Sequence, residues 1–194
     1  MLILDVDNLK NARITLSLVF INIMAFFLFN LALPDSIYFL VQINRNIIED
    51  YELWRLLTSM FIHGDLIHLF SNMFGLFLFG VTVEINKNIS KYQYLIIYFV
   101  SGLIGNLFTL ILFPLNSISL GASGAIFGLL GVSFIIIATD YRPLLFFSLF
   151  YIIFFIALSF TPGINYWAHL FGLLGGIIFG YLFYWRKRSL IYDF

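Results

Sequence analysis

Four polar side chains lie inside apolar stretches of this sequence, and their types suit acyl-transfer chemistry. Ser123 lies between glycines at the start of one apolar run, in the stretch SLGASGAIFGLLG. A serine hydroxyl becomes a nucleophile when a base accepts its proton, and His169, near the start of a later run, can be that base. His68 and Asn72 can donate hydrogen bonds to the negative oxygen that forms when the serine attacks a carbonyl.

Each of these side chains also has a structural interpretation, because polar groups in membrane helices often bond back to a carbonyl or join two helices. The depth that they share in the membrane favours the catalytic interpretation. Ser123, His68 and His169 each lie about 16 residues before the inner end of an apolar run, which is roughly 24 Å of helix. Asn72 follows His68 by four positions and shares its helix face. We therefore expect the four side chains to meet just below the outer surface.

The neighbours of these residues predict a dyad with several supporting groups. No carboxylate flanks His169, so we expect a serine–histidine pair without a third acid. Phe127 lies one helical turn after Ser123 and can stack on the histidine ring. His63 lies about a turn above His68, where it can ease water entry or hold the preceding loop. The backbone N–H of Ser123, at a helix start, can be a further donor to the oxyanion.

Glycines recur at helical spacing in two of the apolar runs. Gly121 and Gly124 leave the hydroxyl of Ser123 uncovered. Small residues every four positions let two helices approach closely, so we expect Gly172 to bring His169 toward the serine. The full pattern is Gly124, Gly128 and Gly131 in one run, and Ala168, Gly172, Gly176 and Gly180 in the other.

The composition is that of a membrane protein. The chain has 194 residues, of which 62% are hydrophobic and only 10% charged, well below the charged fraction of soluble domains. Its formal net charge is zero and no basic stretch is suited to follow a phosphate backbone, so nucleic acid is not an expected partner. The absence of cysteine excludes disulfides and thiolate chemistry. No H-E-x-x-H motif and no aspartate pair within the spans are present, and no metal or other cofactor is expected.

The apolar runs predict an all-α, polytopic fold with six transmembrane helices in a single domain, residues 1–194. A helix needs roughly 20 apolar residues to cross the bilayer. The first run is too long for the core of a cleavable signal, so we expect it to remain in the protein. The predicted spans are 14–33, 66–84, 92–113, 122–139, 144–160 and 166–185.

The basic residues predict the orientation of these spans. Because six spans return the chain to its starting side, both termini share one side of the membrane. By the positive-inside rule the side with more basic residues is cytoplasmic, which suggests a protein of the cell membrane with both termini inside. Only Arg45 and Arg55 lie on the other side, whereas the cytoplasmic set is Lys10, Arg13, Lys87, Lys91, Arg142, Arg186, Lys187 and Arg188.

The long connection from Pro34 to Trp54 mixes acidic, basic and apolar residues. We expect a partly membrane-embedded, amphipathic structure that lies against the bundle, because an unstructured loop of this length is uncommon. Trp54, Arg55 and Glu84 are interpreted most simply as interface anchors and caps.

The ordered motifs resemble those of a known family, the rhomboid intramembrane serine proteases. The resemblance rests on Trp54-Arg55, His63, HLFSN from His68 to Asn72, GVTVE ending at Glu84, GASG around Ser123, and AHLFGLLGG from Ala168 to Gly176. Each motif is weak alone, whereas the set in this order is specific. One departure is Phe127, where many bacterial members carry tyrosine.

This resemblance implies a six-helix bundle with a Ser123–His169 dyad and an oxyanion site of His68, Asn72 and the Ser123 amide. It also implies that the substrates are transmembrane segments of other proteins, cut near their outer ends without metal or ATP. The oligomeric state is open.

Two other kinds of function fit less well. A non-catalytic chaperone or scaffold of the same fold would bind unstable transmembrane helices without cutting them, and such relatives are expected to lose the serine or the histidine. A small transporter would place charges or broken helices at mid-membrane, whereas the charges here lie near the edges of the spans.

Overall fold

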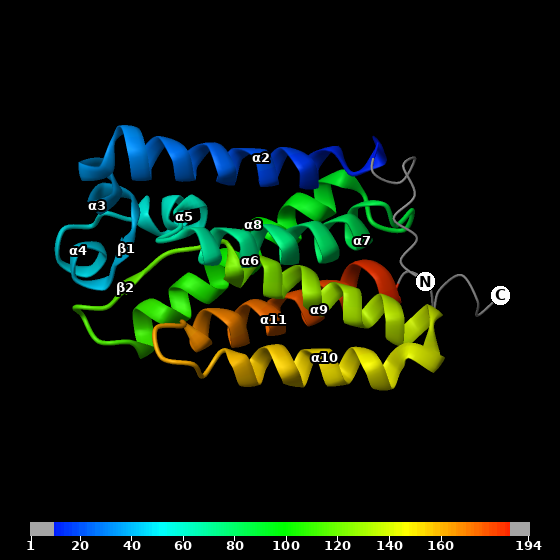
Figure 1. Ribbon diagram of the computed structural model, residues 1–194. Coiled ribbons are helices and arrows are strands. Elements are labelled where there is room, and N and C mark those ends of the chain that lie inside the picture. Colours follow the sequence, from blue (N-terminus) through cyan, green and yellow to red (C-terminus); the bar gives the residue numbers. More distant parts are fainter. Residues whose placement is uncertain (1–9, 187–194) are drawn as a thin grey trace.

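The computed structural model describes residues 10–186, and over this range it is an almost entirely helical bundle (Figure 1). The fifth predicted span is present as a shorter apolar helix, Arg142–Leu158. Every segment agrees with its predicted bounds to within about two residues, the usual spread at helix ends. The five segments long and apolar enough to cross a bilayer are Arg13–Ala32, Leu66–Glu84, Lys91–Leu112, Ser123–Asp140 and Tyr166–Trp185.

Several spans are built from more than one helical element, because wide π-helical turns interrupt or end them. The elements in chain order are α2 (Arg13–Phe27), η1 (Leu28–Ala32), η2 (Pro34–Ser36), α3 (Ile37–Leu40), β1 (Gln42–Ile43), α4 (Asn44–Glu49), α5 (Arg55–Thr58), η3 (Ser59–Phe61), α6 (Leu66–Gly75), η4 (Leu76–Gly80), α7 (Val81–Glu84), α8 (Lys91–Leu112), β2 (Ile118–Ser119), α9 (Ser123–Asp140), η5 (Arg142–Leu144), α10 (Leu145–Leu158), α11 (Tyr166–Gly180) and η6 (Tyr181–Trp185).

Helix α9 occupies the centre of the bundle. It is buried continuously from Gly124 to Ser133, as expected for a helix that is apolar on all sides. It packs most extensively against α11 and α8, while α2 and α10 lie along opposite edges (Figure 1). The start of α2 and the end of η6 lie at the same end of the bundle, and the short elements α3, α4, β1 and β2 lie at the other.

Glycines set the close approach of α9 and α11. A Cβ atom on Gly172 would collide with the carbonyl oxygen of Gly124, and one on Gly176 with that of Gly128. The backbones therefore touch directly along the stripe of small residues in both helices. This contact fixes the start of α11, and with it His169, against the first turns of α9.

Side-chain caps fix where the histidine-bearing helices begin. Asp65 precedes α6, and its Oδ1 accepts a hydrogen bond from the backbone N of His68 at 2.8 Å. Asn165 precedes α11 and accepts from the backbone N of Ala168 at 3.0 Å. Such caps satisfy backbone donors that a helix start leaves free. Each cap lies within one turn of the histidine that its helix carries.

Glu84 caps a helix far from it in sequence. Only 3% of the residue is exposed, so it is buried and not an anchor at the membrane surface. Its carboxylate accepts hydrogen bonds from the backbone N atoms of Ile14 at 2.9 Å and Thr15 at 2.7 Å, in the first turn of α2. The Nζ of Lys91 lies 2.7 Å from the same carboxylate. The charge of Glu84 is thus compensated, and it ties α2 to α7 and α8.

The connection between α2 and α6 is folded against the end of the bundle. Strand β1 pairs antiparallel with β2, with Gln42 opposite Ser119 and Ile43 opposite Ile118. This two-stranded sheet departs from the purely helical expectation, and it satisfies backbone groups that the loop would otherwise leave unpaired. Val41, Ile43 and Ile62 form a small apolar cluster beneath it.

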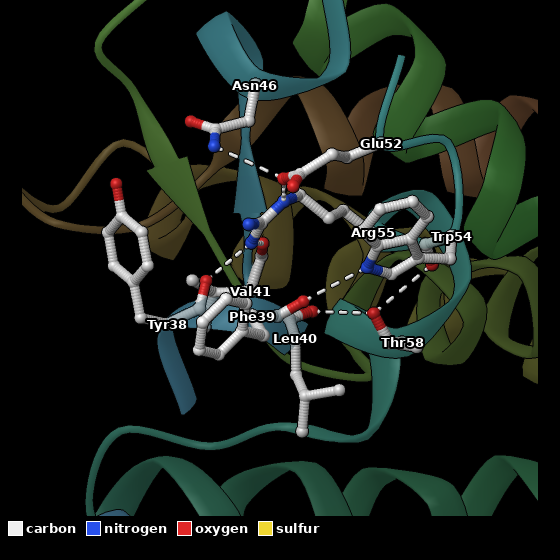
Figure 2. A network of polar contacts seen from close by, with 9 residues as sticks. All are labelled: Tyr38, Phe39, Leu40, Val41, Asn46, Glu52, Trp54, Arg55 and Thr58. Carbon is white, nitrogen blue, oxygen red and sulfur yellow. Dashed lines mark hydrogen bonds and ion pairs between the residues drawn. The ribbon is translucent and has the colours of Figure 1, made fainter. Parts of the chain in front are cut away.

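Arg55 organises this connection from the inside (Figure 2). Its side chain is 1% exposed, which corrects the expectation of an interface anchor. Nε donates to a carboxylate oxygen of Glu52, and Nη1 donates to the carbonyl oxygens of Tyr38 and Val41. Five donors on a planar group allow one arginine to bind three acceptors at once, which here come from residues 38–41 and from Glu52. Trp54 beside it is half exposed and donates to the carbonyl of Phe39 at 3.2 Å.

We expect Arg55→Ala to destabilise the protein by about 3 kcal/mol, because it leaves Glu52 and two carbonyls without their buried partner. Arg45→Ala is the matched control, since the Arg45–Glu49 ion pair is about half exposed and such pairs contribute little. Thermal unfolding of both variants in detergent, with limited proteolysis of residues 34–54, measures the difference. Equal midpoints for the two variants would contradict the organising role of Arg55.

Candidate active site

Ser123 is the first residue of α9 and follows a tight turn at Gly121. Gly121 has φ of +115°, which disfavours any residue with a side chain. A Cβ atom there would also lie 2.7 Å from Nε2 of His68. The backbone N of Gly121 donates to the carbonyl of Ser59 at 2.9 Å, which fixes the turn. The turn that presents Ser123 therefore lies directly against the ring of His68.

His169 lies in the first turns of α11 and is held on two sides. Its ring stacks on that of Phe127, with centroids 4.2 Å apart and planes 12° from parallel. Its Nδ1 lies 2.7 Å from Oγ of Ser159, just after the end of α10. The residue is 8% exposed. Because Phe127 is one turn after Ser123 on α9, this stacking places the imidazole beside the helix that begins with the serine.

His68 and Asn72 lie one turn apart on α6. Asn72 is 6% exposed, and its Nδ2 donates to the carbonyl of His68 at 2.9 Å. An amide nitrogen carries two hydrogens, so one donor remains for another acceptor. Asn72 shares a cavity of about 140 Å³ with Ser123. The cavity lies between α6, α9 and α10 and is lined by Ser71, Asn72, Gly75, Phe79, Ser123, Ile126, Phe127, Leu130 and Phe155.

His63 is fully buried beside His68 and lies outside the spans. Its ring meets that of His68 edge to face, with centroids 5.1 Å apart. Its carbonyl oxygen accepts from Nδ2 of Asn30 at 3.2 Å, which joins the loop to η1. Burial and the nearby His68 lower the pKa of His63 to about 4, so its ring is neutral at physiological pH. It supports His68 and the loop by packing.

The structure thus brings residues of α6, α9 and α11 into one region, though not every expected contact is present. Within the described range 10–186, no hydrogen bond joins Oγ of Ser123 to His169, and their pairing stays a prediction. Hydrogen bonds between catalytic groups are often long in unliganded enzymes. In the same range, no three His, Cys, Asp or Glu side chains gather as metal ligands would.

Two residues make contacts near the site that were not assigned to them from the sequence. Asn165 caps α11 and also donates through Nδ2 to Oγ1 of Thr109 at 2.9 Å and to Oγ of Ser119 at 3.0 Å. An asparagine just before an apolar run is a recognisable cap signal. Ser159 carries no such signal, because its contact with His169 depends on how α10 packs beside α11.

The fold and the site define a class of protein, a helical membrane protein with polar groups gathered near one end of the bundle. Comparison with known proteins agrees with this class. A model of the Rhomboid domain matches residues 50–186. The chain is 36% identical over 145 residues to the "Putative rhomboid protease YdcA" of Bacillus subtilis, covering 71% of this chain and 70% of that protein. It is 34% identical over 152 residues to "RHOMBOID-like protein 6, mitochondrial" of Arabidopsis thaliana, covering 75% of this chain and 48% of that protein.

The chain therefore belongs to the rhomboid family. It spans about half the length of the Arabidopsis relative quoted above. The family also includes proteins named as inactive: "Inactive RHOMBOID-like protein 8" of Arabidopsis thaliana is 36% identical over 94 residues, which is 48% of this chain and 26% of that protein. Membership thus establishes an integral membrane protein of rhomboid fold, and activity depends on the residues of the site.

Proposed function

We propose that this chain is an intramembrane serine endopeptidase, formed as a single domain, in which Ser123 is the nucleophile and His169 the base. The observation that carries the proposal is the position of the imidazole. His169 stacks on Phe127, one turn below the serine on α9, while Ser123 and Asn72 open into the same cavity. Unlike a purely structural serine, Ser123 forms no bond back to a carbonyl within residues 10–186.

The reaction follows from these roles. Oγ of Ser123 attacks the carbonyl carbon of the scissile peptide, and its proton passes to Nε2 of His169. The oxyanion accepts hydrogen bonds from the free Nδ2 hydrogen of Asn72, a ring N–H of His68 and the backbone N–H of Ser123. A single donor of this kind typically lowers the barrier by about 3–4 kcal/mol. His169 then returns the proton to the leaving amine, and water hydrolyses the acyl-enzyme.

The substrate is a transmembrane segment of another protein, and the cavity suggests its route. Phe79 of η4 and Phe155 of α10 form part of the wall between α6 and α10, and their rings meet edge to face with centroids 6.1 Å apart. This side of the cavity is therefore closed by apolar side chains. Contacts between side chains separate more easily than contacts between backbones. A substrate helix enters from the lipid between α6 and α10, and its end unwinds into the cavity beside Ser123.

The basic residues support placement in the cell membrane with both termini in the cytoplasm. Arg13, Lys91 and Arg142 lie near the end of the bundle where α2 begins, and the positive-inside rule places that end inside. Lys187 and Arg188 of the same set lie outside the described residues. The site then faces the outer leaflet. Cysteine-scanning with a membrane-impermeant reagent at exposed positions of α4 tests this orientation.

An active-site fluorophosphonate tests the proposal, because such a reagent phosphonylates only a serine activated by a base. We expect it to label the wild-type protein at Ser123, mapped by peptide mass spectrometry, and not to label His169→Ala. Labelling of His169→Ala at the wild-type rate would show that the base is wrongly assigned. If the wild-type protein were neither labelled nor able to cleave a substrate, a non-catalytic scaffold would be favoured instead. The match to a relative named as inactive makes this the alternative to test.

A further inference from the structure

Ser159 makes two hydrogen-bond contacts through one buried hydroxyl. It follows the last residue of α10 and is 2% exposed. Its Oγ lies 2.8 Å from the carbonyl oxygen of Phe155 and 2.7 Å from Nδ1 of His169. The backbone N of Ser159 donates to the same carbonyl at 3.1 Å. The hydroxyl is therefore held at the helix end, with the imidazole on its other side.

A hydroxyl has a single proton, so these two contacts constrain the tautomer of His169. If the proton goes to the carbonyl of Phe155, the hydroxyl accepts from His169, and Nδ1 must carry a hydrogen. If the proton goes to Nδ1, two oxygen lone pairs face each other at 2.8 Å with no hydrogen between them. Only the first arrangement makes both contacts hydrogen bonds. A neutral imidazole protonated at Nδ1 has a free lone pair at Nε2.

We propose that Ser159 is a positioning residue that holds His169 in the Nδ1–H tautomer, so that Nε2 is available to accept a proton. This inference rests on the proposed function, because it assigns Ser159 the orienting task that a carboxylate performs in a serine–histidine–aspartate triad. The hydroxyl stays neutral throughout. When His169 takes the proton of Ser123, the Nδ1–H bond to Ser159 persists, and the imidazolium keeps an acceptor at its far side.

The position of Ser159 explains why a hydroxyl suits this task. The residue is buried among apolar helix ends, and an ionised carboxylate there would lose its hydration at high cost. A hydroxyl needs only one donor and one acceptor to be satisfied, and the Phe155 carbonyl and the His169 N–H supply them. The stacked Phe127 ring and the Ser159 hydroxyl together fix the plane and the rotation of the imidazole.

Replacement of Ser159 tests the proposal kinetically. We expect Ser159→Ala to lower kcat about 3- to 10-fold, the effect of losing one hydrogen bond, with KM unchanged and slower fluorophosphonate labelling. Ser159→Thr keeps the hydroxyl and should restore most of the rate. Ser148→Ala is the matched control, because Ser148 is a buried serine of α10, and among residues 10–186 its Oγ donates only to the carbonyl of Leu145. Wild-type kcat in Ser159→Ala would overturn the proposal.

The tautomer itself can be measured without any substrate. The chain has three histidines, so ¹⁵N-histidine labelling gives a spectrum in which His169→Ala assigns the His169 signals. We expect Nδ1–H in the wild type and loss of this preference in Ser159→Ala. An Nε2–H wild-type ring would overturn the proposal even if Ser159→Ala failed to fold. A wild type that cleaves no substrate but shows Nδ1–H would instead refute the proposed function.

Discussion

Replacement of Ser123 by alanine should abolish cleavage of a model transmembrane substrate in reconstituted vesicles. Without the hydroxyl no acyl-enzyme can form, and loss of a serine nucleophile typically costs a factor of about 10⁴ or more in kcat. The fold should be unaffected, because Ser123 is only partly buried and its side chain makes no hydrogen bond within the described residues. Appearance of the cleavage product on gels, with its new terminus sequenced, measures the loss.

Ser133→Ala is the control for this experiment. Ser133 lies on the same helix, is 3% exposed, and its Oγ has no hydrogen-bond partner among the described residues. We expect this variant to cleave at the wild-type rate. Cleavage by Ser123→Ala at a rate near that of Ser133→Ala would rule out Ser123 as the nucleophile, whatever the resemblance to the family.

Replacement of Gly172 by alanine should separate α11 from α9. The added Cβ would collide with the backbone of Gly124, and backbone yields less easily than a flexible side chain. Overpacking typically costs about 1–3 kcal/mol, which exceeds the roughly 1 kcal/mol that alanine gains over glycine in a helix. Since displacement of catalytic groups by about 1 Å can cost 100-fold in rate, we expect activity to fall by about that factor.

Gly64→Ala is the matched control, because a Cβ atom there would meet only the side chain of Leu120, at an ordinary 3.8 Å. Thermal unfolding and cleavage rates of the two variants, measured in the same detergent, separate the effect of the helix contact from that of adding a methyl group. If Gly172→Ala retained both wild-type stability and rate, the backbone contact could not be what positions His169.

Much of the fold was predictable because it follows from properties of short stretches. Hydropathy over about 20 residues located the spans, and the order of glycines on 122–139 and 166–185 indicated which helices pack closely. The proximity of Phe127 to the face of Ser123 follows from the helical period alone. These features depend on neighbours along the chain, so a single sequence contains them.

The roles of Arg55, Glu84 and Ser159 were not predictable in the same way. Each is decided by a partner from another segment: the carbonyls of 38–41 for Arg55, the first turn of α2 for Glu84, and the ring of His169 for Ser159. From sequence, Arg55 and Glu84 were interpreted as interface anchors and caps because charged residues near span ends usually face the interface, but the helix that Glu84 caps could not be identified.

The sequence by itself determined that this protein is a helical membrane bundle with two closely packed helices, because apolar length and small-residue period are local quantities. The resemblance to the rhomboid family rests on the order of its motifs along the chain. The tertiary structure alone decided which charges are buried and which hydroxyl lies against the imidazole. A buried polar group must find a hydrogen-bond partner wherever the packing supplies one, and that partner need not be near it in the chain.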